Sequence, residues 1–274
     1  MPEQVSLEGV RQFREDIYRF YRDNKRDLPY RSTRDPYRVL VSEIMLQQTR
    51  VERVNQKFPS FIALFPDFMS LASAPLSEIL RAWQGMGYNR RAKHLKIIAE
   101  KVCGEYSGIL PADPAVLETF PGIGNATARS VCAFAYNLPV VFIETNIRRV
   151  FIHCFFPECE SVSDREILPL VEITLDQANP RDWYYALMDY GTQLKTSVPN
   201  PNRRSHHYTR QPPFKGSDRQ IRGLVLRIVL DEPGISEISL WEKTGCERER
   251  LDRILADLEK EQFIVRKLGI FIIT

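Results

Sequence analysis

The chain is 274 residues long, enough for two domains and a small third. Hydrophobic residues make up 43% and charged residues 27%, and the net charge of +3 permits a nucleic-acid partner without requiring one. No apolar run reaches the roughly 18 residues of a membrane span, and Met1 to Glu8 lack a signal-peptide pattern. The five scattered cysteines indicate a reducing compartment, so we expect a cytoplasmic protein, nucleoid-associated if bacterial.

The first 195 residues predict helices throughout. An amphipathic helix covers Leu7 to Tyr21, and a second covers about Arg38 to Lys57. On the second helix Glu43, Gln47 and Arg50 fall at i, i+4 and i+7, so they are predicted to share a face away from the packing side. That face is either solvated, or the wall of a cleft that holds an acid beside an amide.

The next part of the chain continues the helical pattern, with helices predicted at Phe58 to Leu64, Asp67 to Ala72, Leu76 to Trp83 and Arg90 to Tyr106. The loop from Gly85 to Asn89 contains two glycines and leads into Arg90, Arg91, Lys93 and His94. These side chains either contact a backbone phosphate or form an ordinary solvated helix start.

A glycine-bearing turn lies between residues 117 and 125. The pattern predicts a helix that ends at Thr119 and another that begins at Asn125. Gly122 and Gly124 permit backbone angles that aim N–H groups outward at the start of the second helix, where an anion is favoured. The turn is therefore either a phosphate grip or a plain helix connection. About one helix later, Glu144 precedes a further amphipathic run.

Basic residues predominate after Gly191. Residues 195–227 hold eight Lys or Arg against one acid, Asp218, and four prolines between 199 and 213 oppose a regular helix. This segment, which includes Arg203, Arg204 and Arg210, is either a solvated linker or a DNA contact.

The C-terminal pattern predicts a winged-helix module. Helices fit Arg219 to Leu230, Ser236 to Thr244 and Glu247 to Glu261, and two strands with a turn fit residues 263–274. Such modules bind DNA or proteins through the third helix. Because that helix is acidic overall, a docking or spacer role is an equal alternative to DNA binding.

Six motifs occur in register along the chain: Leu-Pro-Tyr-Arg, Ser-Glu-Ile-Met-Leu-Gln-Gln-Thr, Gly-Met-Gly-Tyr-Asn-Arg-Arg-Ala, Phe-Pro-Gly-Ile-Gly, Glu-Thr-Asn-Ile-Arg-Arg-Val and Ala-Leu-Met-Asp-Tyr-Gly. Over about residues 25–195 this order resembles the helix-hairpin-helix superfamily of DNA base-excision glycosylases. Within it, the sequence is most similar to the MutY-type adenine glycosylases, which act on adenine opposite guanine or oxidised guanine.

The resemblance implies roles for individual residues. Glu43 matches the acid that protonates the adenine leaving group and handles the water, and Glu144 matches the aspartate that stabilises the cationic sugar. Gln47 matches the amide that fills the gap left by the flipped base. Gly122 and Gly124 match the hairpin phosphate grip, where backbone carbonyls hold a monovalent cation, here those of Phe120 and Ile123. The other predicted DNA contacts are Gln48, Tyr88, Asn89, Arg90 and Asn125, together with Arg203 and Arg204 of the basic segment.

The residues suit that chemistry. A base must leave the duplex stack before it can be attacked. Protonating the leaving group needs a carboxyl whose pKa is raised by burial, and a second carboxylate must stay charged beside the sugar. Ala126 occupies the position of the lysine in strand-cutting members, so no Schiff base can form there.

Three departures from the family are visible. Glu144 is longer than the usual aspartate by one methylene. In the family, four cysteines bind an iron–sulfur cluster. The corresponding positions of this chain hold Lys195, Asn202, Ser205 and Gln211, so no cluster or other cofactor is expected. The domain that recognises oxidised guanine is missing, and the winged-helix-like segment stands in its place.

We therefore predict an all-α, two-lobed, clusterless and monofunctional DNA glycosylase with a small α+β winged-helix-like module. One lobe comprises residues 1–28 and 141–216, the other 29–140, and the module 217–274, with a catalytic cleft between the lobes. The expected partner is double-stranded DNA with a mismatched or damaged base, bound by a monomer. The alternatives are a thymine or uracil mismatch glycosylase and a non-catalytic DNA-binding relative.

Overall fold

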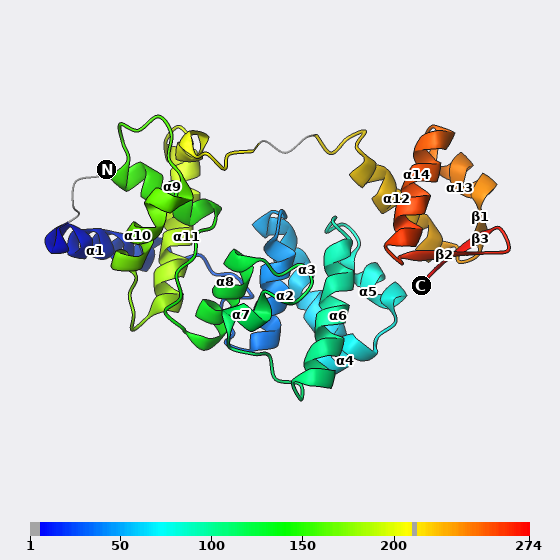
Figure 1. The fold of residues 1–274 in the computed structure, drawn as a ribbon, viewed down its shortest axis with the longest axis horizontal. Coiled ribbons are helices and arrows are strands. Elements are labelled where there is room, and N and C mark those ends of the chain that lie inside the picture. Colours follow the sequence, from blue (N-terminus) through cyan, green and yellow to red (C-terminus); the bar gives the residue numbers. More distant parts are fainter. Residues whose placement is uncertain (1–5, 210–212) are drawn as a thin grey trace. The chain divides into compact units, whose positions relative to one another are not determined.

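The computed structural model describes residues 6–209 and 213–274, which are mostly helical with one three-stranded sheet near the C-terminus (Figure 1). Residues 1–5 and 210–212 lie outside the described residues, and with them the predictions for Arg210 and Gln211. No helix in the described ranges is both long and apolar enough to cross a bilayer.

Contacts divide the chain into two compact units. One holds the residues up to Glu43 and those from Pro111 to 209, and the other holds Ile44–Leu110 and the residues from 213 onward. The predicted lobes were divided differently, at residues 28 and 140, so residues 29–43 and 111–140 group here with the terminal helices. The functional boundaries of the lobes stay a prediction.

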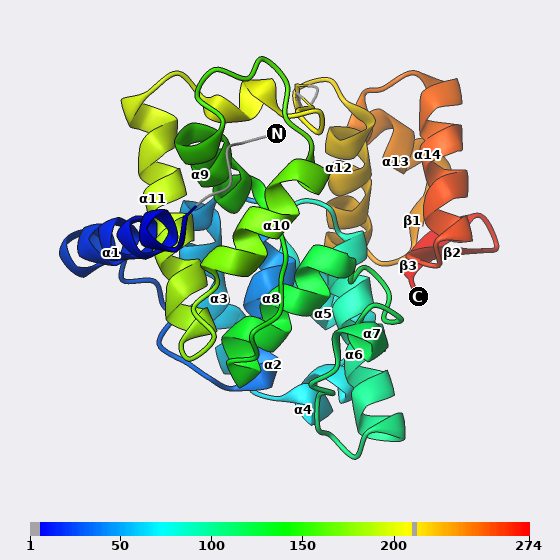
Figure 2. The same cartoon turned by 60° about the vertical axis from the view of Figure 1, so that its left-hand side comes forward.

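The first unit is built around α11 (Pro180–Ser197), which packs against α1 (Leu7–Asn24) and α9 (Thr145–Phe155) (Figure 2). Its core includes the fully buried side chains of Phe151, Trp183 and Tyr184. Burying aromatic rings of this size contributes much of the stability of such a core. The other elements of this unit are most of α2 (Pro36–Leu46), α7 (Pro114–Leu117), α8 (Asn125–Tyr136), α10 (Asp164–Thr174) and η1 (Pro201–Arg204).

The second unit packs α6 (Arg90–Glu105) against α4 (Phe68–Ser73) and α5 (Leu76–Trp83), with α3 (Val51–Leu64) against α5. Asp67 and Ser70 form a reciprocal capping box that starts α4. Trp83 and Phe61 are buried in this unit with their rings edge to face.

The C-terminal module belongs to the second unit. It comprises α12 (Asp218–Asp231), β1 (Ile235–Ser236), α13 (Glu237–Thr244), α14 (Arg248–Lys260), β2 (Ile264–Lys267) and β3 (Ile270–Ile273), with an antiparallel sheet in the order β1-β3-β2. The predicted three helices and hairpin are confirmed. Strand β1 was not predicted, because its two residues carry no alternation pattern. The module contacts α5 through Arg81, whose guanidinium donates to the Leu230 carbonyl at 3.0 Å.

The predicted single helix from Arg38 to Lys57 is wrong. It is two helices, α2 and α3, separated by a turn at 47–50 in which Gln48 has a φ of 54°. The carbonyls of Ile44 and Met45, which a continued helix would use, accept instead from the buried Arg91 at 3.0 and 2.9 Å. Glu43, Gln47 and Arg50 therefore do not share a helical face.

Candidate active site

Glu43 lies on α2 with its carboxyl against α8. The Ser130 hydroxyl donates to Glu43 Oε2 at 2.6 Å. Burial, and secondarily the negative charge of Glu144, raise the pKa of Glu43 to about 7, although the Ser130 bond and the Arg31 charge act in the opposite direction. Glu43 is thus a carboxyl that holds a proton near neutral pH, as a general acid must.

Glu144 is the N-cap of α9. Its Oε1 accepts from the backbone N–H groups of Asn146 and Ile147 at 2.7 and 2.9 Å, and its Oε2 accepts from the Asn146 amide at 3.3 Å. Burial raises the pKa of Glu144, while these amides and the charges of Arg149 and Arg148 oppose the rise. Three donors on one carboxylate, at the positive end of a helix, suit the ionised form. The capping role and a charge-stabilising role are therefore both open to this residue.

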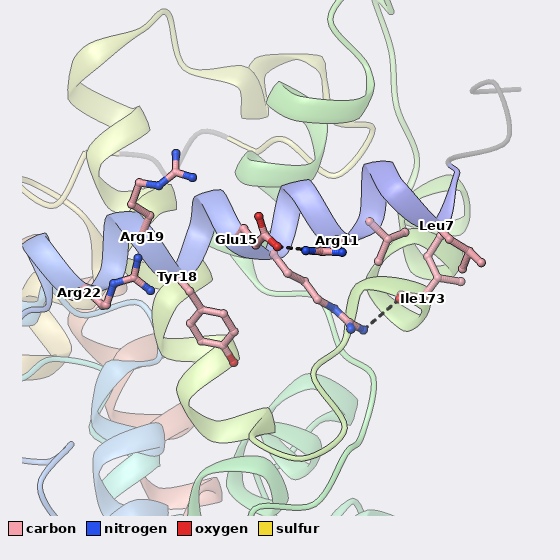
Figure 3. A pocket seen from close by; sticks show the side chains of 9 residues that line it. Leu7, Arg11, Glu15, Tyr18, Arg19, Arg22 and Ile173 are labelled. Carbon is pink, nitrogen blue, oxygen red and sulfur yellow. Dashed lines mark hydrogen bonds and ion pairs between the residues drawn. The ribbon is translucent and has the colours of Figure 1, made fainter.

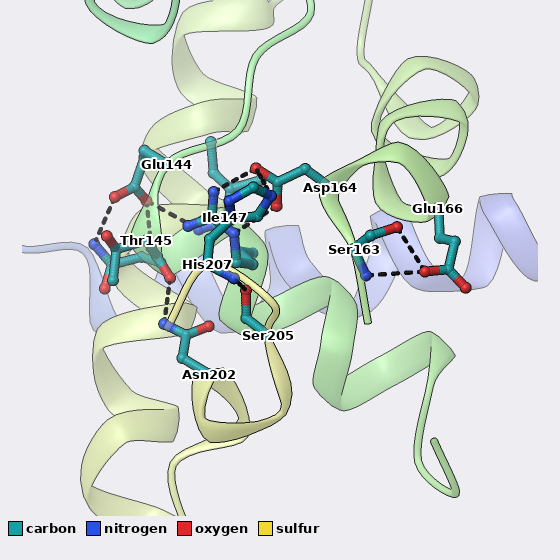
Figure 4. A network of polar contacts seen from close by, with 11 residues as sticks. Glu144, Thr145, Ile147, Ser163, Asp164, Glu166, Asn202, Ser205 and His207 are labelled. Carbon is teal, nitrogen blue, oxygen red and sulfur yellow. Dashed lines mark hydrogen bonds and ion pairs between the residues drawn. The ribbon is translucent and has the colours of Figure 1, made fainter. Parts of the chain in front are cut away.

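The start of α9 is held by neighbouring segments. The Arg149 guanidinium donates to the Gly191 carbonyl at 2.6 Å and to Asn146 Oδ1 at 2.7 Å. A Cβ at Gly191 would lie 2.5 Å from the Asn146 carbonyl oxygen, so only glycine allows α11 to approach α9 this closely. Figure 4 shows Asn202 pointing at Thr145, whose carbonyl it meets at 2.9 Å. The backbone that carries Glu144 is fixed from two sides.

A buried ion pair that the sequence analysis missed joins two of the six motifs. Asp189, 3% exposed, accepts from the Arg31 guanidinium at 2.9 Å and from Arg26 Nε at 2.5 Å. Arg31 also lies 4.4 Å from the centre of the Tyr185 ring. The charge of Arg31 lowers the pKa of Glu43. Asp189, by binding Arg31, therefore fixes the position of a charge that acts on this acid. Both residues stand in quoted motifs, but no local pattern pairs them.

The glycine turn has the predicted form. α7 ends at Leu117, two residues before the predicted end, and α8 begins at Asn125 as predicted. Gly122 has a φ of 77°, in the region that favours glycine. The N-cap of α8 is Gly124, which makes no side-chain capping bond. Helix starts favour anions, and phosphate binding at this one stays a prediction. The Phe120 carbonyl accepts the Ile123 N–H at 3.2 Å within the turn, and the cation site there stays a prediction.

The other predicted DNA contacts on this hairpin include Asn125, whose amide donates to Glu118 at 3.0 Å. The structure places Ala126 one residue further along α8, where its methyl group offers no amine. The phosphate grip of the hairpin and the absence of a nucleophile there stay predictions.

In the second unit, Arg91 ties together the two loops that carry Gln47, Gln48 and Tyr88. Besides the α2 carbonyls it donates to the carbonyls of Gln47, at 2.5 Å, and Met86, at 3.1 Å. Gln48 and Tyr88 both have left-handed backbones, with φ of 54° and 48°, which is costly for side chains of this size. Arg91 is 7% exposed, so it is a structural residue and not the phosphate contact that the sequence allowed.

Arg90 and Lys93 contact the C-terminal module. Arg90 pairs with Glu261 at 2.6 Å, and the Lys93 ammonium donates to the Glu261 backbone carbonyl. Arg219 of α12 bonds the Tyr88 hydroxyl. Asn89 precedes α6 as its N-cap without a side-chain capping bond. DNA contact by Tyr88, Asn89 and Arg90 stays a prediction.

The two arginines of the basic segment differ. Arg203 is exposed, whereas the guanidinium of Arg204 donates to backbone carbonyls after α9, among them those of Pro157 and Cys159, each at 2.9 Å. Within this segment, residues 201–204 form the short helix η1, and Pro201, Asn202 and Ser205 are buried. Of the two arginines, only Arg203 has the exposure that a phosphate contact needs.

The side chains at the register of the iron–sulfur ligands do not fit a cluster. Asn202 bonds the Thr145 carbonyl, the Ser205 hydroxyl accepts from the His207 N–H at 3.1 Å, and Lys195 offers an ammonium. Iron–sulfur clusters need thiolates. No group of three or more metal-binding side chains occurs within the described residues, and the absence of a cluster stays a prediction.

A separate pocket of about 770 Å³ lies along α1 (Figure 3). Its lining is rich in arginine, with Arg11, Arg14, Arg19 and Arg22, and includes Tyr18. Arg14 is engaged at the end of α10, where it donates to the carbonyls of Thr174 and Leu175. Neither Glu43 nor Glu144 lines this pocket, so it is not the candidate active site.

Comparison with known proteins gives consistent results. Residues 41–167 match the profile of the HhH-GPD superfamily of base excision DNA repair proteins. The adenine DNA glycosylase of Mycolicibacterium smegmatis is 33% identical over 270 residues, covering 90% of this chain and 92% of that protein. The adenine DNA glycosylase of Mycobacterium tuberculosis is 30% identical over 273 residues, with 88% of each chain covered.

A solved structure with a similar fold is a thermostable thymine-DNA glycosylase. It superposes with a TM-score of 0.63 and 25% identity, covering 72% of this chain and 93% of that chain. The similarity leaves out about a quarter of this chain.

Proposed function

Because the chain belongs to the HhH-GPD superfamily of base excision DNA repair proteins, we propose that it is a monofunctional DNA glycosylase that removes adenine from a mismatch with guanine or oxidised guanine. The observation that supports this most is the pair of half-buried carboxylates, Glu43 and Glu144. Glu43 has a pKa raised to about 7, and Glu144 accepts three hydrogen bonds that favour its ionised form. Hydrolysis of an N-glycosidic bond requires an acid that donates a proton and a carboxylate that stabilises the cationic sugar, and we assign these roles to Glu43 and Glu144.

In the proposed reaction the flipped adenine leaves as its bond to the sugar breaks. Glu43 gives its proton to the departing base, and the electrons of the broken bond stay with that base. The sugar becomes cationic, and the Glu144 carboxylate stabilises it. Water then adds to the sugar carbon and its proton passes to the Glu43 carboxylate, which restores the acid and leaves an abasic site.

The longer side chain at 144 is compatible with this role. Its carboxylate reaches the N–H groups of the second and third residues of α9, as a capping side chain does. The backbone amides that bond the carboxylate oppose the rise in its pKa that burial causes. The extra methylene is therefore accommodated without loss of the helix start.

Strand cleavage through an imine is not part of this proposal, because Ala126 cannot form one. Borohydride treatment during turnover on a cleavable duplex should trap no covalent adduct. A stable protein–DNA adduct would show that another lysine serves as nucleophile and would overturn the monofunctional assignment.

We further propose that the protein acts as a cytoplasmic monomer on double-stranded DNA. We also propose that it carries no iron, so that it should purify colourless.

A thymine or uracil glycosylase acting opposite guanine is the second candidate. The structural similarity to a thymine-DNA glycosylase favours it. The greater sequence identity over most of the chain to adenine glycosylases favours adenine.

A panel of duplexes tests the substrate. Each of the four bases and uracil is placed opposite guanine and opposite oxidised guanine, and abasic sites are counted after alkaline cleavage in single-turnover reactions. We expect product only from the adenine duplexes. Release of thymine or uracil opposite guanine, without release of adenine, would replace the first candidate by the second. A panel without any product would contradict both.

A further inference from the structure

Ser130 is a buried residue to which the sequence analysis gave no role. It lies in the middle of α8 and is 3% exposed. Its Oγ is 2.6 Å from Glu43 Oε2 and 3.0 Å from the Thr127 carbonyl oxygen. A hydroxyl has one proton to donate, so it cannot donate fully to both acceptors at once.

The Ser130 hydroxyl keeps an acceptor in both charge states of Glu43. When Glu43 is ionised, the hydroxyl donates to the charged Oε2. When Glu43 carries a proton on Oε1, Oε2 is the carbonyl oxygen of the neutral acid and accepts less strongly, and the Thr127 carbonyl remains within reach of Oγ as the other acceptor. No buried hydroxyl is left unbonded in either state, which avoids the cost of an unsatisfied polar group.

The same geometry distinguishes the two oxygens of the acid. As long as Ser130 donates to Oε2, a proton taken up by Glu43 goes to Oε1. The structure gives Oε1 no hydrogen-bond donor among the residues it describes. A proton on Oε1 is available to a departing base, whereas a proton on Oε2 points into α8.

We propose that Ser130 is a positioning residue that holds Glu43 through Oε2 and directs the catalytic proton to Oε1. This inference rests on the proposed function, in which Glu43 is the general acid. The competing explanation is that Ser130 only bonds the carbonyl three residues earlier in its own helix, as many helical serines do. On that explanation its loss would affect stability and leave the titration of Glu43 unchanged.

The experiment compares Ser130→Ala with the parent protein in single-turnover excision from pH 5 to 9. The hydroxyl stabilises the ionised carboxyl. Its removal should therefore raise, by about one pH unit, the pH at which the rate falls to half on the alkaline side. Loss of the Ser130–Glu43 bond should lower the constant excision rate at low pH by about tenfold, with duplex affinity unchanged. Ser130→Thr keeps a hydroxyl and should restore the position of the alkaline fall.

Ser42→Ala is the matched control. Ser42 is also a buried helical serine, 2% exposed, but its hydroxyl bonds only the Val39 carbonyl, at 2.8 Å. The other groups that act electrostatically on Glu43, or on which Glu43 acts, are Tyr30, Arg31, Glu144 and Tyr185, and they are the same in both variants. Ser42→Ala should therefore keep the parent profile. If Ser130→Ala gives that profile too, the proposal is overturned.

A second measurement does not depend on catalysis. The side-chain carboxyl of Glu43 is followed by carbon-13 NMR in protein labelled at glutamate, with Glu43→Gln to assign the signal. We expect its titration midpoint to rise by about one pH unit in Ser130→Ala. Identical midpoints would overturn the proposal even if excision were impaired. A shifted midpoint in a protein that excises no adenine would leave the Ser130 contact standing and refute the proposed function instead.

Discussion

Glutamates in the two units of the molecule show how environment sets the role of one residue type. Glu43 is half-buried, and its hydrogen-bond donor among the described residues is the neutral Ser130 hydroxyl. Loss of solvation raises its pKa to about 7. Glu261 follows α14 and accepts from two guanidinium groups, those of Arg90 at 2.6 Å and Arg222 at 2.7 Å. Burial acts to raise the pKa of Glu261, but these two partners outweigh it and lower the pKa.

The difference teaches that burial alone does not make an acid catalytic. A carboxyl becomes a proton donor at neutral pH where its partners are too weak to hold the ionised form. Two arginines convert the same side chain into a permanently charged docking contact. Glu144 lies between these extremes, because backbone amides and more distant arginines counter its burial.

Removing the two half-buried acids tests the comparison most directly. Glu43→Gln cannot deliver a carboxyl proton, and Glu144→Gln removes the charge that faces the cationic sugar. Each should slow single-turnover excision by at least about 100-fold, because each acts on the transition state. Duplex affinity, measured by anisotropy, should change little because it depends mainly on phosphate contacts. Near-normal excision by both variants would remove the catalytic assignment.

Ionisation of Glu43 should also lower the free energy of unfolding of the protein at high pH. Its pKa is about 7 in the folded chain against an ordinary 4.5, so its contribution is fully present below pH 4.5 and is lost as the pH rises through 7. Denaturation at pH 8 should show Glu43→Gln to be more stable than the parent by on the order of 2 kcal/mol, with little difference at pH 4.5. Equal stability at both pH values would mean that Glu43 is not desolvated.

Replacing Glu261, which holds the C-terminal module against Arg90, should have the opposite effect, a loss of stability without a loss of rate. Glu261→Gln loses charge-assisted bonds to Arg90 and Arg222, which are partly exposed, so the cost should be about 1 kcal/mol and should shrink in high salt. The excision rate should stay within about twofold of the parent rate, since Glu261 is assigned no part in the chemistry. A loss of rate comparable to that of Glu43→Gln would contradict the assignment of Glu261 as a structural residue and Glu43 as the proton donor.

The smallest effects are expected on the surface of the first unit. Arg203→Ala should reduce the slope of log affinity against log salt by about 0.9 if Arg203 contacts one phosphate. Arg204→Ala should instead lower the free energy of unfolding, because it leaves several backbone carbonyls without their donor. If Arg203→Ala leaves the slope unchanged, this turn is not a DNA contact.

Features encoded locally were predictable from the sequence. The glycine turn and the start of α8 at Asn125 depend on neighbours within a few residues. The C-terminal helices and hairpin were visible for the same reason, since each has its own period of apolar residues.

Features that depend on distant partners were not predictable. The turn at 47–50 forms because Arg91, more than forty residues later, takes the carbonyls that would continue α2. The Ser130 bond to Glu43 spans 87 residues, and the Arg31 bond to Asp189 spans 158. Periodicity carries no information about such contacts, so the environment that raises the pKa of Glu43 could not be foreseen.

The central claim is that Glu43 donates a proton to the leaving base with a pKa near 7, and the pH dependence of adenine excision tests it most directly. Single-turnover rates on an adenine duplex should be highest on the acid side, halve near pH 7 and then fall about tenfold for each further pH unit, as the protonated fraction of Glu43 declines. Glu43→Gln should show no such fall. A parent rate that stays constant from pH 6 to 9 would contradict the account.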